Sequence, residues 1–109
     1  MTKVIFNRKN GKIIRFVISG HTGKEEFGKD VLCAAISSVA QNALVGITEI
    51  LNREPKIFKI DDGYLEFELQ KQDYDDQSVQ LLLETCLKSL KEIVKNEKKF
   101  VKLEEKNEI

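Results

Sequence analysis

Residues 3–19 read KVIFNRKNGKIIRFVIS, two runs rich in Ile, Val and Phe with a short polar segment between them. The centre of that segment, Asn10-Gly11, supplies the positive φ angles that a two-residue hairpin turn requires. Runs of β-branched and aromatic residues of this length are typical of strands. The sequence therefore predicts an antiparallel hairpin with strands at 3–7 and 12–19.

A second hairpin is predicted further along the chain. Residues 56–60 and 64–69 flank the turn Asp61-Asp62-Gly63, and Asp-Gly is another strong hairpin sequence. In the second of these strands, apolar residues at 65, 67 and 69 alternate with glutamates at 66 and 68. Because successive side chains of a strand point to opposite faces, this strand has one apolar face and one charged face.

Two other segments have apolar residues every three or four positions, the period of an amphipathic helix. The first runs from Asp30 to about Asn52, and its apolar positions are Leu32, Ile36, Val39, Ala43, Ile47 and Ile50. The second runs from about Gln77 to Asn96, and its apolar positions are Val79, Leu83, Cys86, Leu90 and Ile93. Asp30 is placed to cap the first helix, and Pro55 prevents its continuation.

The expected fold is α+β: two ββα units forming a mixed sheet with two helices packed on it. Residues 100–103 are compatible with a short last strand at the C-terminal end. The chain has 109 residues, the length of one domain, so residues 1–109 are expected to form a single domain.

Composition excludes several function classes. Eighteen Lys and Arg balance eighteen Asp and Glu, which argues against a strongly basic nucleic-acid-binding protein. The chain has two cysteines, Cys33 and Cys86, which are too few for a disulfide scaffold. They are 53 positions apart, which is not the spacing of a metal-ligand motif. No apolar run approaches the roughly 20 residues of a membrane span. We expect a cytoplasmic protein with free thiols, without a cofactor and without a membrane partner.

The residues best suited to covalent chemistry are His21 and Cys33. They are twelve positions apart, and the glycine-rich segment 20–29, predicted as a loop, lies between them. A thiol attacks well only as the thiolate, so it needs a base such as an imidazole beside it. If the helix starts at Asp30, its first-turn amides lie near Cys33 and can stabilise an oxyanion.

Asp30 and Ser37 lie three positions before and four positions after Cys33, so the three share one helix face. Ser37 can hydrogen-bond near the thiol, and Asp30 can cap the helix or orient His21. Taken singly, each residue also has a simpler interpretation. Cys33 is compatible with a small buried side chain, His21 with a solvated loop residue, Asp30 with a plain cap, and Ser37 with a bond to the preceding turn.

The combination of these residues resembles the ribosomal-processing cysteine protease (Prp) family. The matching segments are Gly20-His21-Thr22 and GKDVLCAAIS at 28–37. The family pattern is Gly-His-Ala, a short glycine-containing loop, and Gly-x-Asp-x-x-Cys-Ala-Ala/Gly-x-Ser. The order of hairpins and helices matches over nearly the whole chain. Thr22 departs from the family alanine, which puts substrate fit in doubt more than the reaction.

The resemblance implies a Cys-His endopeptidase that removes the short N-terminal extension of bacterial large-subunit ribosomal protein twenty-seven. By carry-over, Cys33 is the nucleophile and His21 the general base, with Asp30 and Ser37 in supporting roles. It also implies a homodimer.

Two other function classes stay open. A non-enzymatic ribosome-associated or RNA-binding module would use the lysines of 88–102, although the glutamates among them and the neutral net charge count against direct nucleic-acid binding. A thiol redox protein fits less well, because no second cysteine lies near Cys33 in the sequence.

Overall fold

The computed structural model describes residues 1–20 and 26–108, with the backbone alone described for residues 26–30. Along the chain, the elements are β1 (Thr2–Lys9), β2 (Lys12–Ser19), α1 (Glu26–Val45), a π-helical turn (Gly46–Ile50), β3 (Ile57–Asp61), β4 (Tyr64–Glu68), a 3₁₀ turn (Lys71–Asp73), α2 (Gln77–Val94) and β5 (Val101–Asn107).

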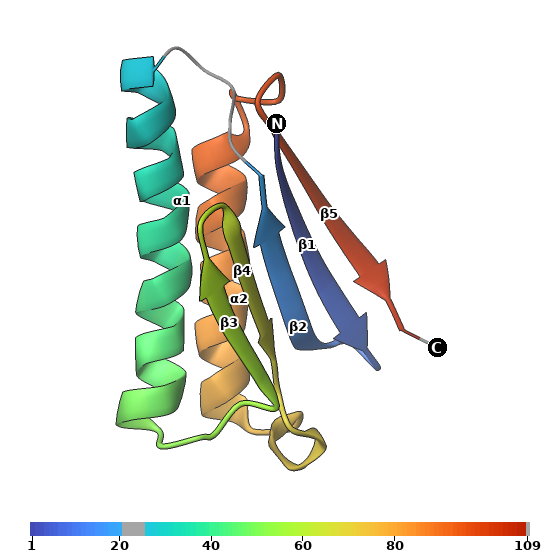
Figure 1. Ribbon diagram of the computed structural model, residues 1–109. Coiled ribbons are helices and arrows are strands. Elements are labelled where there is room, and N and C mark those ends of the chain that lie inside the picture. The colour runs from blue at the N-terminus through green and yellow to red at the C-terminus, as the bar shows by residue number, and fades with distance from the viewer. Residues whose placement is uncertain (21–25, 109) are drawn as a thin grey trace.

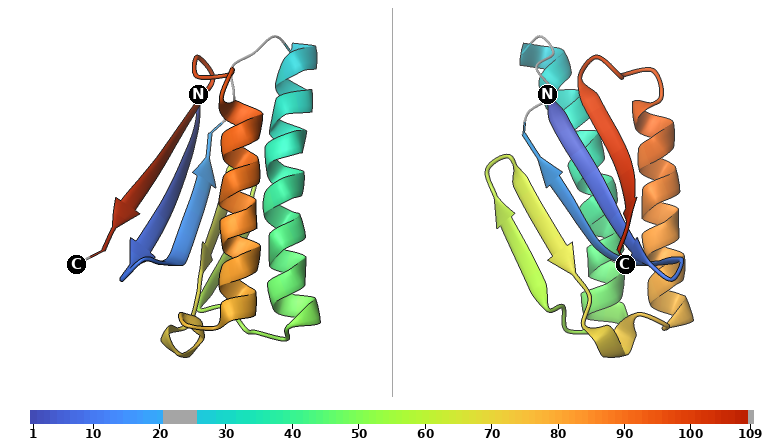
Figure 2. Two further views of the ribbon diagram at one scale, coloured as in Figure 1. Left: turned by 180° about the vertical axis from the view of Figure 1, so that it is seen from behind. Right: turned by 90° about the vertical axis from the view of Figure 1, so that its right-hand side faces the viewer.

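The five strands form one mixed sheet in the order β3-β4-β2-β1-β5. Strand β5 runs parallel to β1, and every other neighbouring pair is antiparallel. Helices α1 and α2 run in opposite directions on one face of the sheet and leave the other face open (Figures 1 and 2). The predicted α+β class, with two helices on a mixed sheet, is confirmed.

Both predicted hairpins are present, and the turn between β1 and β2 has the expected backbone. Asn10 and Gly11 have φ angles of 51° and 82°, and Gly63 has a φ of 68°. Positive φ at both central residues, as in Asn10-Gly11, is the geometry whose twist matches that of two antiparallel strands. In the turn between β3 and β4, Gly63 has positive φ and Asp62 does not. The turn residues therefore fix the local pairing of β1 with β2 and of β3 with β4.

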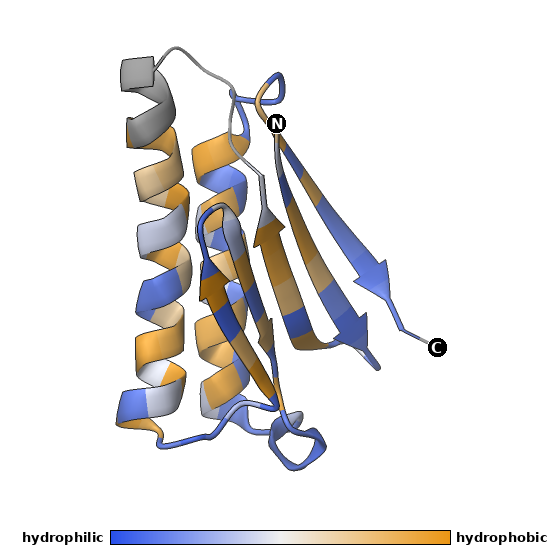
Figure 3. Cartoon of the chain, in the orientation of Figure 1, coloured by the Kyte–Doolittle hydropathy of each residue, from blue (hydrophilic) through white to orange (hydrophobic). Residues whose placement is uncertain are grey.

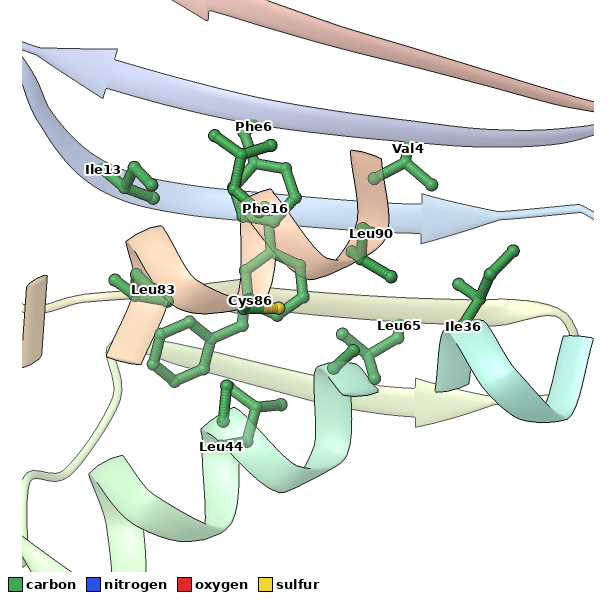
Figure 4. Close-up of a cluster of buried hydrophobic side chains, with 14 of the residues drawn as sticks. Val4, Phe6, Ile13, Phe16, Ile36, Leu44, Leu65, Leu83, Cys86 and Leu90 are labelled. Carbon is green, nitrogen blue, oxygen red and sulfur yellow. The ribbon is translucent and has the colours of Figure 1, made fainter. Parts of the chain in front are cut away.

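The core lies between the helices and the sheet (Figure 4). Phe6 stacks on Phe16 with ring centroids 5.0 Å apart, and Phe16 contacts Phe67 at 5.7 Å. These three rings come from β1, β2 and β4, so they join the central strands beneath the helices. Cys86 of α2 is 3% exposed in this cluster, which confirms that it is a core residue.

Helix α1 begins earlier than the sequence predicts. Its first residue is Glu26, so Asp30 is the fifth helical residue and does not occupy the N-cap. The prediction was wrong because Gly28 was taken to indicate a loop. One glycine inside a helix costs only about 1 kcal/mol relative to alanine, which does not end a helix.

The last strand is longer than predicted. Strand β5 extends from Val101 to Asn107 and pairs with β1 along its whole length, from Thr2–Val101 to Arg8–Asn107. The sequence indicated only 100–103, since the following residues are charged. Figure 3 shows β5 as mostly hydrophilic, so backbone pairing with β1 holds it in place more than apolar burial does.

The segment Val31–Ile50 is apolar for its length. By length and composition alone, these 20 helical residues could cross a membrane, which differs from the expectation that no run approaches that length. One third of the most apolar window is buried inside the protein. The side chains of Ile36, Ala40, Leu44 and Ile47 are part of the core, so the segment is a core helix.

Candidate active site

Three side chains one helical turn apart line one side of α1 beside a cavity. They are Cys33, Ser37 and Gln41, and the cavity has a volume of about 290 Å³. The spacing of four residues places them in a row, as the sequence predicted for Cys33 and Ser37. Gln41 Nε2 donates to Ser37 Oγ at 2.9 Å, so the hydroxyl oxygen is the acceptor in this bond.

The other walls of the cavity come from the sheet. Thr2 begins β1, Gly20 follows β2, and the turn between β3 and β4 lies opposite α1. Gly20 has a φ of 90°, and its N–H donates to Gly63 O at 2.8 Å, so the end of β2 is joined to that turn. The remaining lining residues are Ile18, Ile36, Ile60, Asp61, Asp62, Tyr64 and Leu65.

The two cysteines have different surroundings. Cys33 is half-buried and lines the cavity, whereas Cys86 is buried in the core. Burial raises the pKa of the Cys86 thiol to about 12, so it stays protonated at neutral pH. Of the two, only Cys33 is accessible to a molecule in the cavity.

Two of the predicted site residues fall outside what the structure describes. His21 lies in the segment 21–25, and the side chain of Asp30 is not described either. Their expected contacts with Cys33 stay predictions.

One expectation about Cys33 was wrong. Because α1 begins at Glu26, Cys33 is its eighth residue, roughly 10 Å from the helix start at 1.5 Å per residue. The unpaired amides of a helix belong to its first turn, and the helix-dipole effect decreases within that turn. The first-turn amides are therefore too distant to bind an oxyanion at Cys33.

Several cavity residues were not identified from the sequence. Gln41 follows the four-residue spacing of Cys33 and Ser37, so that spacing could have identified it. Asp61 and Asp62 were interpreted only as turn residues, and Thr2 carries no sequence pattern at all. Thr2 is 3% exposed, and its Oγ1 has no hydrogen-bond partner among the described residues.

A polar network lies at the rim of the cavity on the open face of the sheet. Tyr64 donates its hydroxyl to Glu66 Oε1 at 2.9 Å, and Arg15 donates to Glu66 Oε2 at 2.9 Å. These two hydrogen bonds hold the pKa of Glu66 below its ordinary value, and the bond from Arg15 has the larger effect. Within residues 1–20 and 26–108, no group of three or more His, Cys, Asp or Glu is arranged to hold a metal ion.

Comparison with known proteins is consistent with the half-buried thiol in a cavity. The family model described as "Cysteine protease Prp" matches residues 1–102. The chain belongs to the Prp cysteine protease family. Members of this family are hydrolases, and the segment that matches contains both His21 and Cys33.

Curated relatives carry the same family name. The ribosomal processing cysteine protease Prp of Staphylococcus aureus (strain Mu50) is 34% identical over 86 residues, which cover 76% of this chain and 77% of that protein. The protein of the same name from Bacillus subtilis is 29% identical over 102 residues, covering 90% of this chain and 91% of the relative.

Solved structures share the fold, and two of those described here are of Prp proteins. SMU.848 from Streptococcus mutans has a TM-score of 0.86 and 26% identity, covering 99% of this chain and 96% of that one. The essential ribosomal processing protease Prp from S. aureus, in complex with a covalently linked product peptide, has a TM-score of 0.86 and 27% identity, covering 97% of this chain and 100% of that one. A further S. aureus Prp structure, in complex with a substrate peptide, has a TM-score of 0.82 and 26% identity, with coverage of 97% and 100%.

Proposed function

We propose that this Prp-family chain is a cysteine endopeptidase that removes the N-terminal extension of bacterial large-subunit ribosomal protein twenty-seven, in the cytoplasm. The observation that carries the proposal is the position of Cys33, a half-buried thiol in the wall of a cavity of about 290 Å³. Relatives named for ribosomal processing, and structures of such a protease with bound peptides, support a peptide substrate.

In this proposal His21 is the general base for Cys33. His21 takes the thiol proton, and the thiolate attacks the scissile carbonyl to form a tetrahedral intermediate. His21 then protonates the leaving amine, and water hydrolyses the thioester. Because Cys33 is the eighth residue of α1, the helix N-terminus contributes little to thiolate formation, and the imidazole must supply most of it.

Ser37 and Asp30 have supporting roles in the same proposal. Since Ser37 Oγ already accepts a hydrogen bond from Gln41 Nε2, its own proton is available to donate into the cavity. Because it lies one turn from Cys33, the Ser37 hydroxyl would stabilise negative charge that develops on the substrate. Asp30 would orient His21.

The proposal can be tested by measuring the rate at which the protein cleaves a synthetic peptide that copies the ribosomal-protein extension. Cys33→Ala should abolish cleavage, and His21→Ala should reduce kcat by about 10²–10⁴. Cys86→Ala is the matched control, because it removes the other thiol from the core and should leave kcat/KM unchanged. Wild-type cleavage by Cys33→Ala would refute the proposal.

The homodimer is a further part of the proposal. Between Val31 and Thr48 the chain has no charged residue, and the exposed positions Ser38, Asn42 and Val45 follow the 3,4 spacing of a helix–helix contact. We propose that a second copy packs against this face of α1. Sedimentation equilibrium should detect a dimer that Val45→Lys dissociates and that Leu81→Lys, the same kind of change at an exposed apolar residue of α2, leaves intact.

The RNA-binding alternative receives less support. Several lysines near the C-terminal end form ion pairs within the chain: Lys91 with Glu105, Lys95 with Glu92, and Lys102 with Glu104. Their charge is largely compensated by these partners, so they do not form a uniformly basic surface for phosphates.

A further inference from the structure

The edge of the sheet next to the cavity is formed by β3. In the described part of the chain, no strand pairs with its outer side. The four residues from Phe58 to Asp61 are all exposed, so neither helix covers this edge. An exposed strand edge has unpaired peptide groups that can bind another extended chain.

The register of the hairpin indicates which peptide groups of β3 are unpaired. Asp61 and Tyr64 flank the two-residue turn and therefore form a hydrogen-bonded pair. Hydrogen-bonded pairs alternate along antiparallel strands, so Lys59 and Ile57 also pair with β4. The peptide groups of Phe58 and Ile60 consequently point away from the sheet.

The side chains of the same two residues lie on the helix-covered face. Phe58 and Ile60 are opposite the buried residues Phe67 and Leu65, yet they are 42% and 55% exposed. The ring of Phe58 contacts that of Phe67 edge-on, with centroids 6.1 Å apart. Ile60 lines the cavity that contains Cys33. An apolar surface thus runs along the edge into the cavity.

We propose that β3 binds the substrate as an added strand, so that the enzyme recognises an extended peptide with apolar side chains at alternate positions. The inference rests on the proposed peptidase function. Hydrogen bonds from the peptide groups of Phe58 and Ile60 would hold the substrate backbone. Two apolar substrate side chains, two residues apart, would contact Phe58 and Ile60, and the cavity beyond places the next residues beside Cys33.

Binding is tested on the Cys33→Ala protein by amide hydrogen exchange, which does not depend on cleavage. The probe is a decapeptide that copies the ribosomal-protein extension across the cleavage point. At a saturating concentration, exchange of the Phe58 and Ile60 amides should slow at least tenfold. Exchange at Lys59 and Asp61 should not change, because these amides already bond to β4.

Kinetics provide a second measurement, with a matched control in the same strand. Ile60→Thr keeps the β-branched shape and removes apolar contact, so KM for the decapeptide should rise about tenfold. Ile57→Thr makes the same change on the opposite face of β3, and KM should stay unchanged. In a series of decapeptides that each carry one N-methylated backbone amide, binding should weaken when the methyl group is on every second residue. This is the period at which the amides of an added strand point toward β3.

The possible outcomes separate this inference from the proposed function. Unchanged exchange at Phe58 and Ile60 with saturating peptide would overturn the added strand, even if the peptide is cleaved. Slow exchange at both amides before peptide is added would also overturn it, because a second copy would then occupy the edge. Binding at β3 without any cleavage by the wild-type protein would keep the inference and refute the peptidase function.

Discussion

The side-chain amide of Gln80 bonds to both peptide groups of Ile13. Ile13 N–H donates to Gln80 Oε1 at 2.9 Å, and Gln80 Nε2 donates to Ile13 O at 2.8 Å. A shift of register between β1 and β2 lies next to Ile13, and β4 pairs with β2 only as far as Arg15. The buried glutamine of α2 therefore completes the hydrogen bonding of β2 beyond the end of β4.

Replacing Gln80 should be costly for stability. Gln80→Leu leaves the N–H and the carbonyl of buried Ile13 without partners, and each unpaired group costs about 1–3 kcal/mol. We expect the free energy of unfolding, measured by urea denaturation, to decrease by about 2–4 kcal/mol. Gln70→Ala is the control, because Gln70 bonds to the carbonyl of Glu54 at an exposed site. Equal effects of the two changes would contradict this role of Gln80.

The ion pairs of Arg8 should make the free energy of unfolding depend on pH in the acidic range. It bonds to both carboxylate oxygens of Glu84, at 2.6 and 2.9 Å, and to Glu105 at 2.9 Å. The bond from Arg8 holds the pKa of Glu84 below its ordinary value of 4.5, and the bonds from Lys91 and then Arg8 do the same for Glu105.

Since these two pKa values are lower in the folded protein, the unfolded chain takes up protons first as the pH falls. The stabilisation is complete above pH 4.5 and is lost as the pH decreases through the lowered values. Arg8→Gln should reduce the free energy of unfolding by about 1 kcal/mol at neutral pH. Below pH 4.5, the free energy of unfolding of this variant should decrease less with falling pH than that of the wild-type protein. Lys95→Gln, at an exposed pair, is the control. An unchanged acid profile in Arg8→Gln would refute the linkage.

Iodoacetamide should modify Cys33 and spare Cys86 in the folded protein. With a pKa of about 12, on the order of one Cys86 thiol in ten thousand is ionised at pH 8, and the side chain is also buried. Mass spectrometry of the folded protein should detect one added group, on the peptide that contains Cys33. In urea both cysteines should react, and modification of Cys86 without denaturant would contradict its burial.

Ser37→Ala should decrease kcat by about tenfold and leave KM nearly unchanged. That decrease corresponds to about 1.4 kcal/mol of transition-state stabilisation, the amount expected from one hydroxyl donor. Ser78 is exposed in the first turn of α2 and does not line the cavity, so Ser78→Ala should have wild-type kinetics. A rise in KM with an unchanged kcat would assign Ser37 to substrate binding instead.

The sequence alone determined the local elements of this protein. Asn10-Gly11 and Asp62-Gly63 specify hairpins because the conformation of a two-residue turn depends on the residues in it. The helices follow from apolar spacing, and the row of Cys33 and Ser37 from the geometry of a helix. The family follows from the segments 20–22 and 28–37, whose residues are close together in the chain.

Only the tertiary structure decided features that join distant parts of the chain. The cavity brings Thr2, Cys33 and Ile60 together, and the pairing of β5 with β1 joins the two ends of the sequence. Helix α1 starts at Glu26, which its local sequence did not indicate. Contacts of this kind depend on how the helices pack on the sheet and which strands become neighbours, and no local propensity encodes either.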